Sequence, residues 1–141
     1  MNPILLVEDD ESLATLLVRS LRGHGYSVVV ATDVESAGTS LDEGLQPSIV
    51  LLDLNLPGET GWSLLRREDL RGAASPPVVV VSAMTVQPSR LREAGVVGFL
   101  PKPFALATLI ATIERVASPG ADRGVSTSRA VSIEDQVGRS G

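Results

Sequence analysis

The chain of 141 residues has no cysteine and few aromatic residues, and each lack excludes a class of protein. Without cysteine it can form no disulfide bond, thiolate metal site or cysteine nucleophile, which fits a cytoplasmic protein. Because aromatic residues make up only 3% of the chain and hydrophobic residues 43%, the core must consist of Val, Leu, Ile and Ala. Such a core is typical of a parallel sheet covered by helices on both faces.

Positive charge is also scarce, since the formal net charge is -5, and nothing indicates direct nucleic-acid binding. No apolar run approaches the roughly 20 residues of a membrane span. The N-terminus lacks the basic and apolar regions of an export signal, so we expect no membrane partner. Among the 12 basic residues, Lys102 is the single lysine. The single histidine, His24, lies between two glycines, which favours a helix end over a phosphohistidine.

Short apolar runs alternate with helical patterns along the chain. Five runs have the length and composition of buried strands, at residues 3–7, 26–31, 48–53, 76–83 and 96–100. The fourth helix has room for only a short stretch between Pro88 and Gly95. The alternation predicts an α/β domain, a doubly wound five-stranded parallel sheet flanked by five helices. From Ser118 onward the composition is polar, so we expect one folded domain at 1–117 and a disordered tail at 118–141.

Polar side chains stand where the predicted strands end. They are Glu8, Asp9, Asp10, Asp53, Ser82 and Lys102. In a doubly wound sheet, ligands bind beyond the carboxyl ends of the strands. We therefore expect these side chains to meet at one edge of the sheet.

The chemistry of this set favours phosphoryl transfer. Carboxylates from two neighbouring strands make a hard-oxygen site suited to Mg²⁺. The Lys102 ammonium suits a phosphoryl oxygen, and the Ser82 hydroxyl can donate a hydrogen bond to another. Asp53 would be the nucleophile. Acids at a helix start also cap that helix, and we assign this simpler role to Asp10, with Glu11 as a surface residue.

Four segments carry a family pattern: ILLVEDDE, LLDLNLPGETGWSLL, VVVVSA and GFLPKPF. In these segments the chain resembles a receiver domain of the two-component response regulator family, from Pro3 to about Ala117. The PG-x-x-G turn and the KPF tripeptide are the specific features. The resemblance implies a flavodoxin-like fold with strand order 2-1-3-4-5 and a cis peptide between Lys102 and Pro103.

The resemblance also implies roles for the residues at the strand ends. The phosphoacceptor is Asp53. The Mg²⁺ ligands are Glu8, Asp9, Asp53 and the backbone carbonyl of Asn55. The phosphoryl-binding residues are Ser82 and Lys102, and the switch residues are Ser82 and Phe99. An aromatic residue in a strand is as often simply core, so both interpretations of Phe99 stay open.

Family proteins accept the phosphoryl group from a histidine kinase, a phosphotransfer protein or a small phosphodonor. They respond by shifting the face made of the fourth helix, fifth strand and fifth helix. The resemblance implies a phosphoprotein rather than an enzyme, which binds a downstream protein through that face. Autodephosphorylation and a homodimer are further expectations. The residues after Ala117 are too few for a DNA-binding unit, so a stand-alone receiver is expected.

Two alternatives stay open. A receiver-like module that binds partners without phosphorylation is favoured by the segment between Ser82 and Gly95, which is shorter than is usual in the family. An aspartyl-phosphate phosphatase generally needs a second acid two residues after the nucleophile, where this chain has Asn55. We interpret Gly58 and Gly61 as turn residues.

Overall fold

The structure, a computed structural model, describes residues 2–117, and the tail predicted at 118–141 falls outside them. Five parallel strands form one sheet in the order β2-β1-β3-β4-β5. Their bounds are β1 Ile4–Val7, β2 Val28–Ala31, β3 Ile49–Asp53, β4 Val78–Ser82 and β5 Val96–Pro101. The predicted fold class and strand order are confirmed. The first four strands are slightly shorter than predicted, and β5 is one residue longer.

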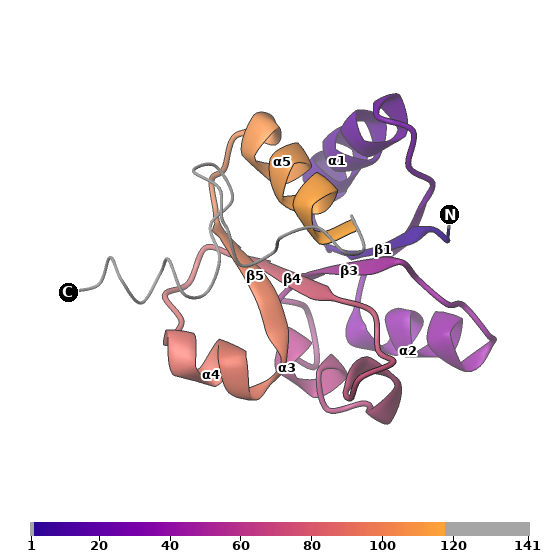
Figure 1. The fold of residues 1–141 in the computed structure, drawn as a ribbon, viewed down its shortest axis with the longest axis vertical. Helices are drawn as coiled ribbons and strands as arrows, with labels where there is room; N and C mark the ends of the chain where they lie inside the picture. Colours follow the sequence, from indigo (N-terminus) through magenta and orange to yellow (C-terminus); the bar gives the residue numbers. More distant parts are fainter. Residues whose placement is uncertain (1, 118–141) are drawn as a thin grey trace.

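Helices cover both faces of the sheet. Their bounds are α1 Glu11–Gly23, α2 Val34–Asp42, α3 Gly61–Leu64, α4 Pro88–Glu93 and α5 Leu106–Ala117, with a 3₁₀ turn, η1, at Glu68–Leu70. Helices α1 and α5 lie on one face, and α2, α3 and α4 lie on the other (Figure 1). The result is a three-layer sandwich with the sheet in the middle.

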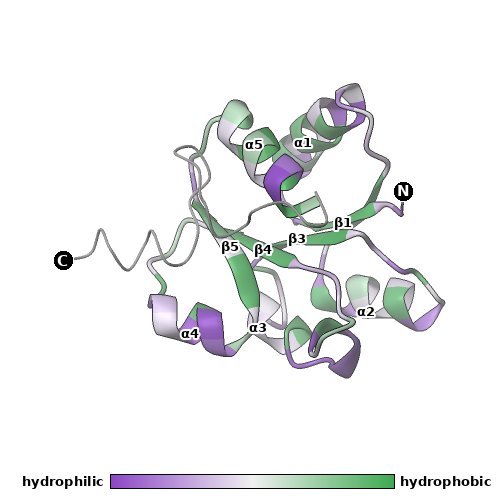
Figure 2. Ribbon diagram, in the orientation of Figure 1, coloured by the Kyte–Doolittle hydropathy of each residue, from purple (hydrophilic) through white to green (hydrophobic). Residues whose placement is uncertain are grey.

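Strand side chains alternate between two cores, because successive residues of a strand point to opposite faces. In β1, Ile4 and Leu6 pack with α1 and α5, whereas Leu5 and Val7 pack with α2, α3 and α4. Every residue of β1, β3 and β4 is buried. Figure 2 shows the strands as hydrophobic and places the hydrophilic positions on helices and loops. This double burial explains the continuous aliphatic runs of the sequence.

Local signals fix the ends of α1 and α2. Asp10 caps α1 by accepting a 3.0 Å hydrogen bond from the backbone three residues on, as predicted. Asp33 caps α2 in the same way, with a 2.7 Å bond from the N–H of Ser36. His24 closes α1, with its Nδ1 2.9 Å from the carbonyl oxygen of Ser20. The predicted helix-end role of His24 is confirmed.

Helix α3 stops after one turn, and the chain continues into η1. Leu65 and Leu70 are both buried, and their five-residue spacing does not fit one face of a continuous helix. The Arg67 guanidinium pairs with Asp42 of α2 at 2.7 Å and with Asp69 at 2.9 Å, which ties this segment to α2.

Helix α4 is short, as predicted. It has six residues, begins with Pro88 in its first turn, and buries only Leu91. Proline is favoured at this position because its missing N–H would have no helical partner there. A helix with one buried anchor is held weakly against the sheet.

Candidate functional site

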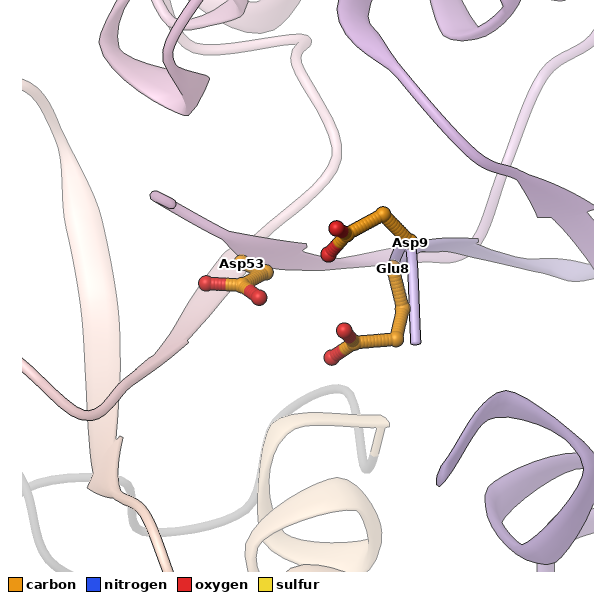
Figure 3. Close-up of side chains that lie close together, drawn as sticks. All are labelled: Glu8, Asp9 and Asp53. Carbon is orange, nitrogen blue, oxygen red and sulfur yellow. The ribbon is translucent and has the colours of Figure 1, made fainter. Parts of the chain in front are cut away.

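Three carboxylates meet where β1 and β3 end. Glu8 and Asp9 directly follow β1, and Asp53 is the last residue of β3. One carboxylate oxygen from each lies within 4.8 Å of the others. Figure 3 shows the three side chains close together, with Asp53 beside the neighbouring residues Glu8 and Asp9. The structure therefore brings together the acids that the sequence placed at neighbouring strand ends.

These three acids differ in exposure. Glu8 is 1% exposed and Asp53 is 3% exposed, whereas Asp9 is open to solvent. Asp10 belongs to the cap of α1 rather than to this group, and Glu11 is exposed. Glu8 and Asp53 thus form the floor of the site, and Asp9 forms its rim.

The single lysine lies against the floor of the site. Lys102 Nζ donates hydrogen bonds to Asp53 Oδ2 at 2.9 Å and to Glu8 Oε1 at 3.0 Å. Its backbone N–H donates to the carbonyl oxygen of Ser82 at 2.8 Å, which fixes the start of the loop after β5. The Lys102–Pro103 peptide bond is cis, as the family resemblance implies.

The pKa shifts of the ionised groups follow from burial and from these contacts. Burial raises the pKa of the Glu8 carboxyl more than hydrogen bonds from Lys102 and from the Asp10 backbone lower it. Burial would lower the pKa of Lys102, but its bonds to Asp53 and Glu8 outweigh that effect and raise the pKa. Lys102 therefore stays protonated. Three carboxylates against one ammonium leave two negative charges when all are ionised.

The Asp53 carboxylate is held in one orientation. Its Oδ1 accepts a 2.9 Å hydrogen bond from the Asn55 backbone N–H, while Oδ2 faces Lys102. Ser82 ends the neighbouring strand and is fully buried, and its Oγ accepts a 3.0 Å bond from the backbone N–H of Met84. Asn55 is exposed, on the loop that leaves β3. Asp53, Ser82 and Lys102 thus lie at the carboxyl ends of three adjacent strands, β3, β4 and β5.

The two glycines of the PG-x-x-G turn are required for different structural reasons. Gly58 has φ +77°, a conformation that favours glycine, so the turn interpretation is confirmed there. The same interpretation is wrong for Gly61, which starts α3 with an ordinary φ. A Cβ on Gly61 would lie 2.6 Å from the carbonyl oxygen of Asp53 and 2.9 Å from the Cα of Leu54. Only glycine lets α3 pack this closely behind the Asp53 backbone.

Two aromatic residues, Phe99 in β5 and Trp62 in α3, differ in their surroundings. Phe99 is 5% exposed and packs in the core with α2, α3 and α4, and its role as a switch residue stays a prediction. Trp62 is half-buried, and the guanidinium of Arg90 lies 4.0 Å from its ring centroid. Sequence reasoning missed Arg90, because no local pattern links a residue of α4 to one at the start of α3.

The donor set of the acidic cluster fits Mg²⁺. It offers only oxygen ligands, which suit hard cations, and no sulfur or imidazole. Mg²⁺ is commonly bound through one or two carboxylates while keeping several waters. The exposed Asp9 opens the cluster to solvent on one side, as a site that keeps several waters on its ion requires.

Comparison with known proteins agrees with this geometry. The family model described as "Response regulator receiver domain" matches residues 4–114. The chain is 37% identical over 124 residues to the sensory transduction protein RegX3 of Mycobacterium tuberculosis, covering 86% of this chain and 53% of RegX3. It is 36% identical over 118 residues to the transcriptional regulatory protein CpxR of Escherichia coli, covering 82% of this chain and 49% of CpxR. The chain thus spans about half the length of these relatives.

Solved structures show the same likeness. The non-phosphorylated HemR receiver domain from Leptospira biflexa superposes with a TM-score of 0.73 at 34% identity, covering 84% of this chain and 95% of that domain. The chemotaxis response regulator CheY4 of Vibrio cholerae gives a TM-score of 0.70 at 26% identity, covering 82% of this chain and 98% of CheY4. Within residues 2–117, no helix is long and apolar enough to cross a membrane.

Proposed function

This chain belongs to the response regulator receiver domain family of two-component signalling, and from that premise we propose that Asp53 accepts a phosphoryl group in a Mg²⁺-dependent reaction. One observation supports the proposal above all others. Lys102 Nζ contacts both Asp53 and Glu8 at the strand edge where Asp9 adds a third carboxylate. The direct test is incubation with acetyl phosphate and Mg²⁺ followed by intact mass measurement, which should show one added phosphoryl group.

In the proposed reaction, an Asp53 carboxylate oxygen forms a bond to phosphorus, and the bond from phosphorus to the donor's leaving atom breaks. The leaving atom keeps the electron pair, and an aspartyl phosphate remains. The hydrogen bond from the Asn55 backbone holds one carboxylate oxygen in place. Lys102 is placed to donate to a phosphoryl oxygen, with the Ser82 hydroxyl as a second donor.

We propose that Glu8, Asp9, Asp53 and the Asn55 backbone carbonyl hold the Mg²⁺. When bound, the ion neutralises charge on the phosphoryl oxygens. The protein's part is to place its carboxylates on two adjacent strand ends, with two of them buried and fixed by hydrogen bonds.

The two alternative functions gain little support. The interaction module without phosphorylation has only the short α4 in its favour, whereas the contacts of Lys102 with Asp53 and Glu8 support the phosphoacceptor. The phosphatase lacks its second acid, because Asn55 stands there and is exposed. We therefore propose a phosphoacceptor rather than an enzyme, and we further propose that the protein hydrolyses its own acyl phosphate.

Response regulators act with histidine kinases or phosphotransfer proteins, and one of these is the proposed donor. We place the receiver unit at residues 1–117 and the protein in the cytoplasm. The proposed output surface for a downstream protein, or for a second copy of the chain, is the α4-β5-α5 face. We expect no direct contact with nucleic acid from this acidic domain.

Substitution of the neighbouring acids Asp9 and Asp10 should separate metal binding from helix capping. Asp9→Ala should abolish most of the thermal stabilisation that Mg²⁺ gives, because a bound ligand stabilises only through its contacts with the folded state. Asp10→Ala should lower the free energy of unfolding by about 0.5–2 kcal/mol, through loss of the cap, and should keep the Mg²⁺ response. Thermal unfolding with and without Mg²⁺ measures both. Equal loss of the Mg²⁺ response in the two variants would contradict the assignment.

The proposed switch residues, Ser82 and Phe99, indicate which segments should change conformation on phosphorylation. If Ser82 turns its hydroxyl toward a phosphoryl oxygen and Phe99 moves with it, hydrogen exchange should change in residues 82–94 and around Phe99. The segment 85–94 should exchange fastest in the described domain, since α4 has a single buried anchor. Beryllofluoride, a phosphoryl mimic, allows the measurement, and α1 is the internal control that should stay unchanged. Unchanged protection from 82 to 117 with the mimic bound would leave Asp53 as an acceptor without this switch.

A further inference from the structure

A cavity of about 450 Å³ lies between the loop after β3 and the loop after β4. Its walls are mainly apolar, with Trp62, Met84 and Val86 among them, and Arg90 contributes a cation. This combination of apolar walls and a few polar groups, at this volume, is typical of small-molecule sites.

Two lining residues connect the cavity to the acidic edge. Asn55 and Met84 both line it, and their backbone N–H groups donate hydrogen bonds to Asp53 Oδ1 and Ser82 Oγ. The cavity therefore lies beside the proposed phosphoryl position.

Arg90 supplies the positive charge of the cavity wall. Its guanidinium carbon lies 4.0 Å from the centroid of the Trp62 ring, a cation–π contact that uses none of its N–H donors. Arg90 forms no ion pair with any residue among 2–117. Arg67, in contrast, forms ion pairs with Asp42 and Asp69. A guanidinium edge matches the two oxygens of a carboxylate.

We propose that this cavity binds the acyl group of a small acyl phosphate larger than acetyl phosphate, with Arg90 as the specificity residue for the carboxylate that leaves. The inference rests on the proposed phosphoacceptor role of Asp53. An Asp53 oxygen bonds to phosphorus, the bond between phosphorus and the acyl oxygen breaks, and the carboxylate leaves with the electron pair. Arg90 stabilises the negative charge that develops on that carboxylate, and the apolar walls contact its alkyl chain.

The test compares three donors on the wild type and on Arg90→Gln. With butyryl phosphate, Arg90→Gln should lower the rate of phosphorylation about tenfold, as expected for loss of a charge-assisted hydrogen bond. With phosphoramidate, whose leaving group is ammonia, the rate should not change. The wild type should react about threefold to tenfold faster with butyryl phosphate than with acetyl phosphate, because two more methylene groups are buried.

Arg92→Gln is the matched control, since Arg92 is an exposed arginine of the same helix that does not line the cavity. It should react like the wild type with every donor. Equal losses with butyryl phosphate and phosphoramidate in Arg90→Gln, or no loss with either, would overturn the assignment of Arg90.

Binding of butyrate tests the cavity without any phosphoryl transfer. Trp62 is the only tryptophan, so its fluorescence reports directly on the cavity. Butyrate should change that fluorescence at lower concentration than acetate, and Arg90→Gln should weaken the response. No response to butyrate would overturn the inference even if Asp53 is phosphorylated. Failure of every donor with the wild type would instead overturn the phosphoacceptor role and, with it, the acyl phosphate assignment.

Discussion

Asp53→Asn should abolish phosphoryl uptake from acetyl phosphate while leaving the protein folded. Asparagine has nearly the same shape but no nucleophilic carboxylate. Its single side-chain oxygen can keep only one of the hydrogen bonds that now come from Asn55 and Lys102. Loss of the other should cost about 1 kcal/mol, offset in part by relief of repulsion with Glu8. Acid-labile phosphate and urea unfolding measure the two effects.

The matched control for Asp53→Asn is Asp69→Asn, because Asp69 is exposed, lies in η1 and pairs with Arg67 instead of Lys102. This variant should take up phosphate like the wild type. Uptake that persists in Asp53→Asn, or that disappears in Asp69→Asn, would contradict the proposed nucleophile.

Lys102→Ala should slow phosphoryl uptake by about 10²–10³-fold, the usual effect of removing one preorganised donor from a developing negative charge. It should also lower the free energy of unfolding by about 1–3 kcal/mol, because Glu8 and Asp53 would remain buried without their ammonium. The Lys102 side chain is 20% exposed, which keeps this cost below that of a fully buried pair. Rates by intact mass and urea unfolding test both numbers.

Mg²⁺ distinguishes an electrostatic role of Lys102 from simple packing. Added Mg²⁺ should restore part of the stability of Lys102→Ala, since a cation replaces the lost positive charge beside the two carboxylates. Arg71→Ala, at an exposed arginine after η1, is the control and should show neither the loss nor the rescue. An uptake rate in Lys102→Ala equal to the wild type would remove Lys102 from the proposed mechanism.

The fold was predictable because its signals are local. Continuous aliphatic runs mark strands buried on both faces, and Asp10 and Asp33 mark helix starts by side-chain capping. The strand ends then place the acids at one edge by topology alone. The short α4 was also predictable, since Pro88 and Gly95 bound its length.

The remaining features depend on contacts between distant residues. The break after α3 follows from where Leu70 must be buried and from the pairing of Arg67 with Asp42, 25 residues away. Lys102 contacts Glu8, which lies 94 residues earlier in the sequence, and no local sequence pattern predicts that contact. The sequence also could not separate buried Glu8 from exposed Asp9, because the difference arises only when the strand end is packed.

The most direct test of the account is to find which residue carries the acyl phosphate. Wild-type protein treated with acetyl phosphate and Mg²⁺ is reduced with borohydride, which converts an aspartyl phosphate to homoserine, and its peptides are mapped by tandem mass spectrometry. We predict homoserine at position 53 alone, and none when Mg²⁺ is chelated beforehand. Reduction at Asp9 or Glu8, or an unmodified Asp53 in fully folded protein with Mg²⁺ present, would contradict the central claim.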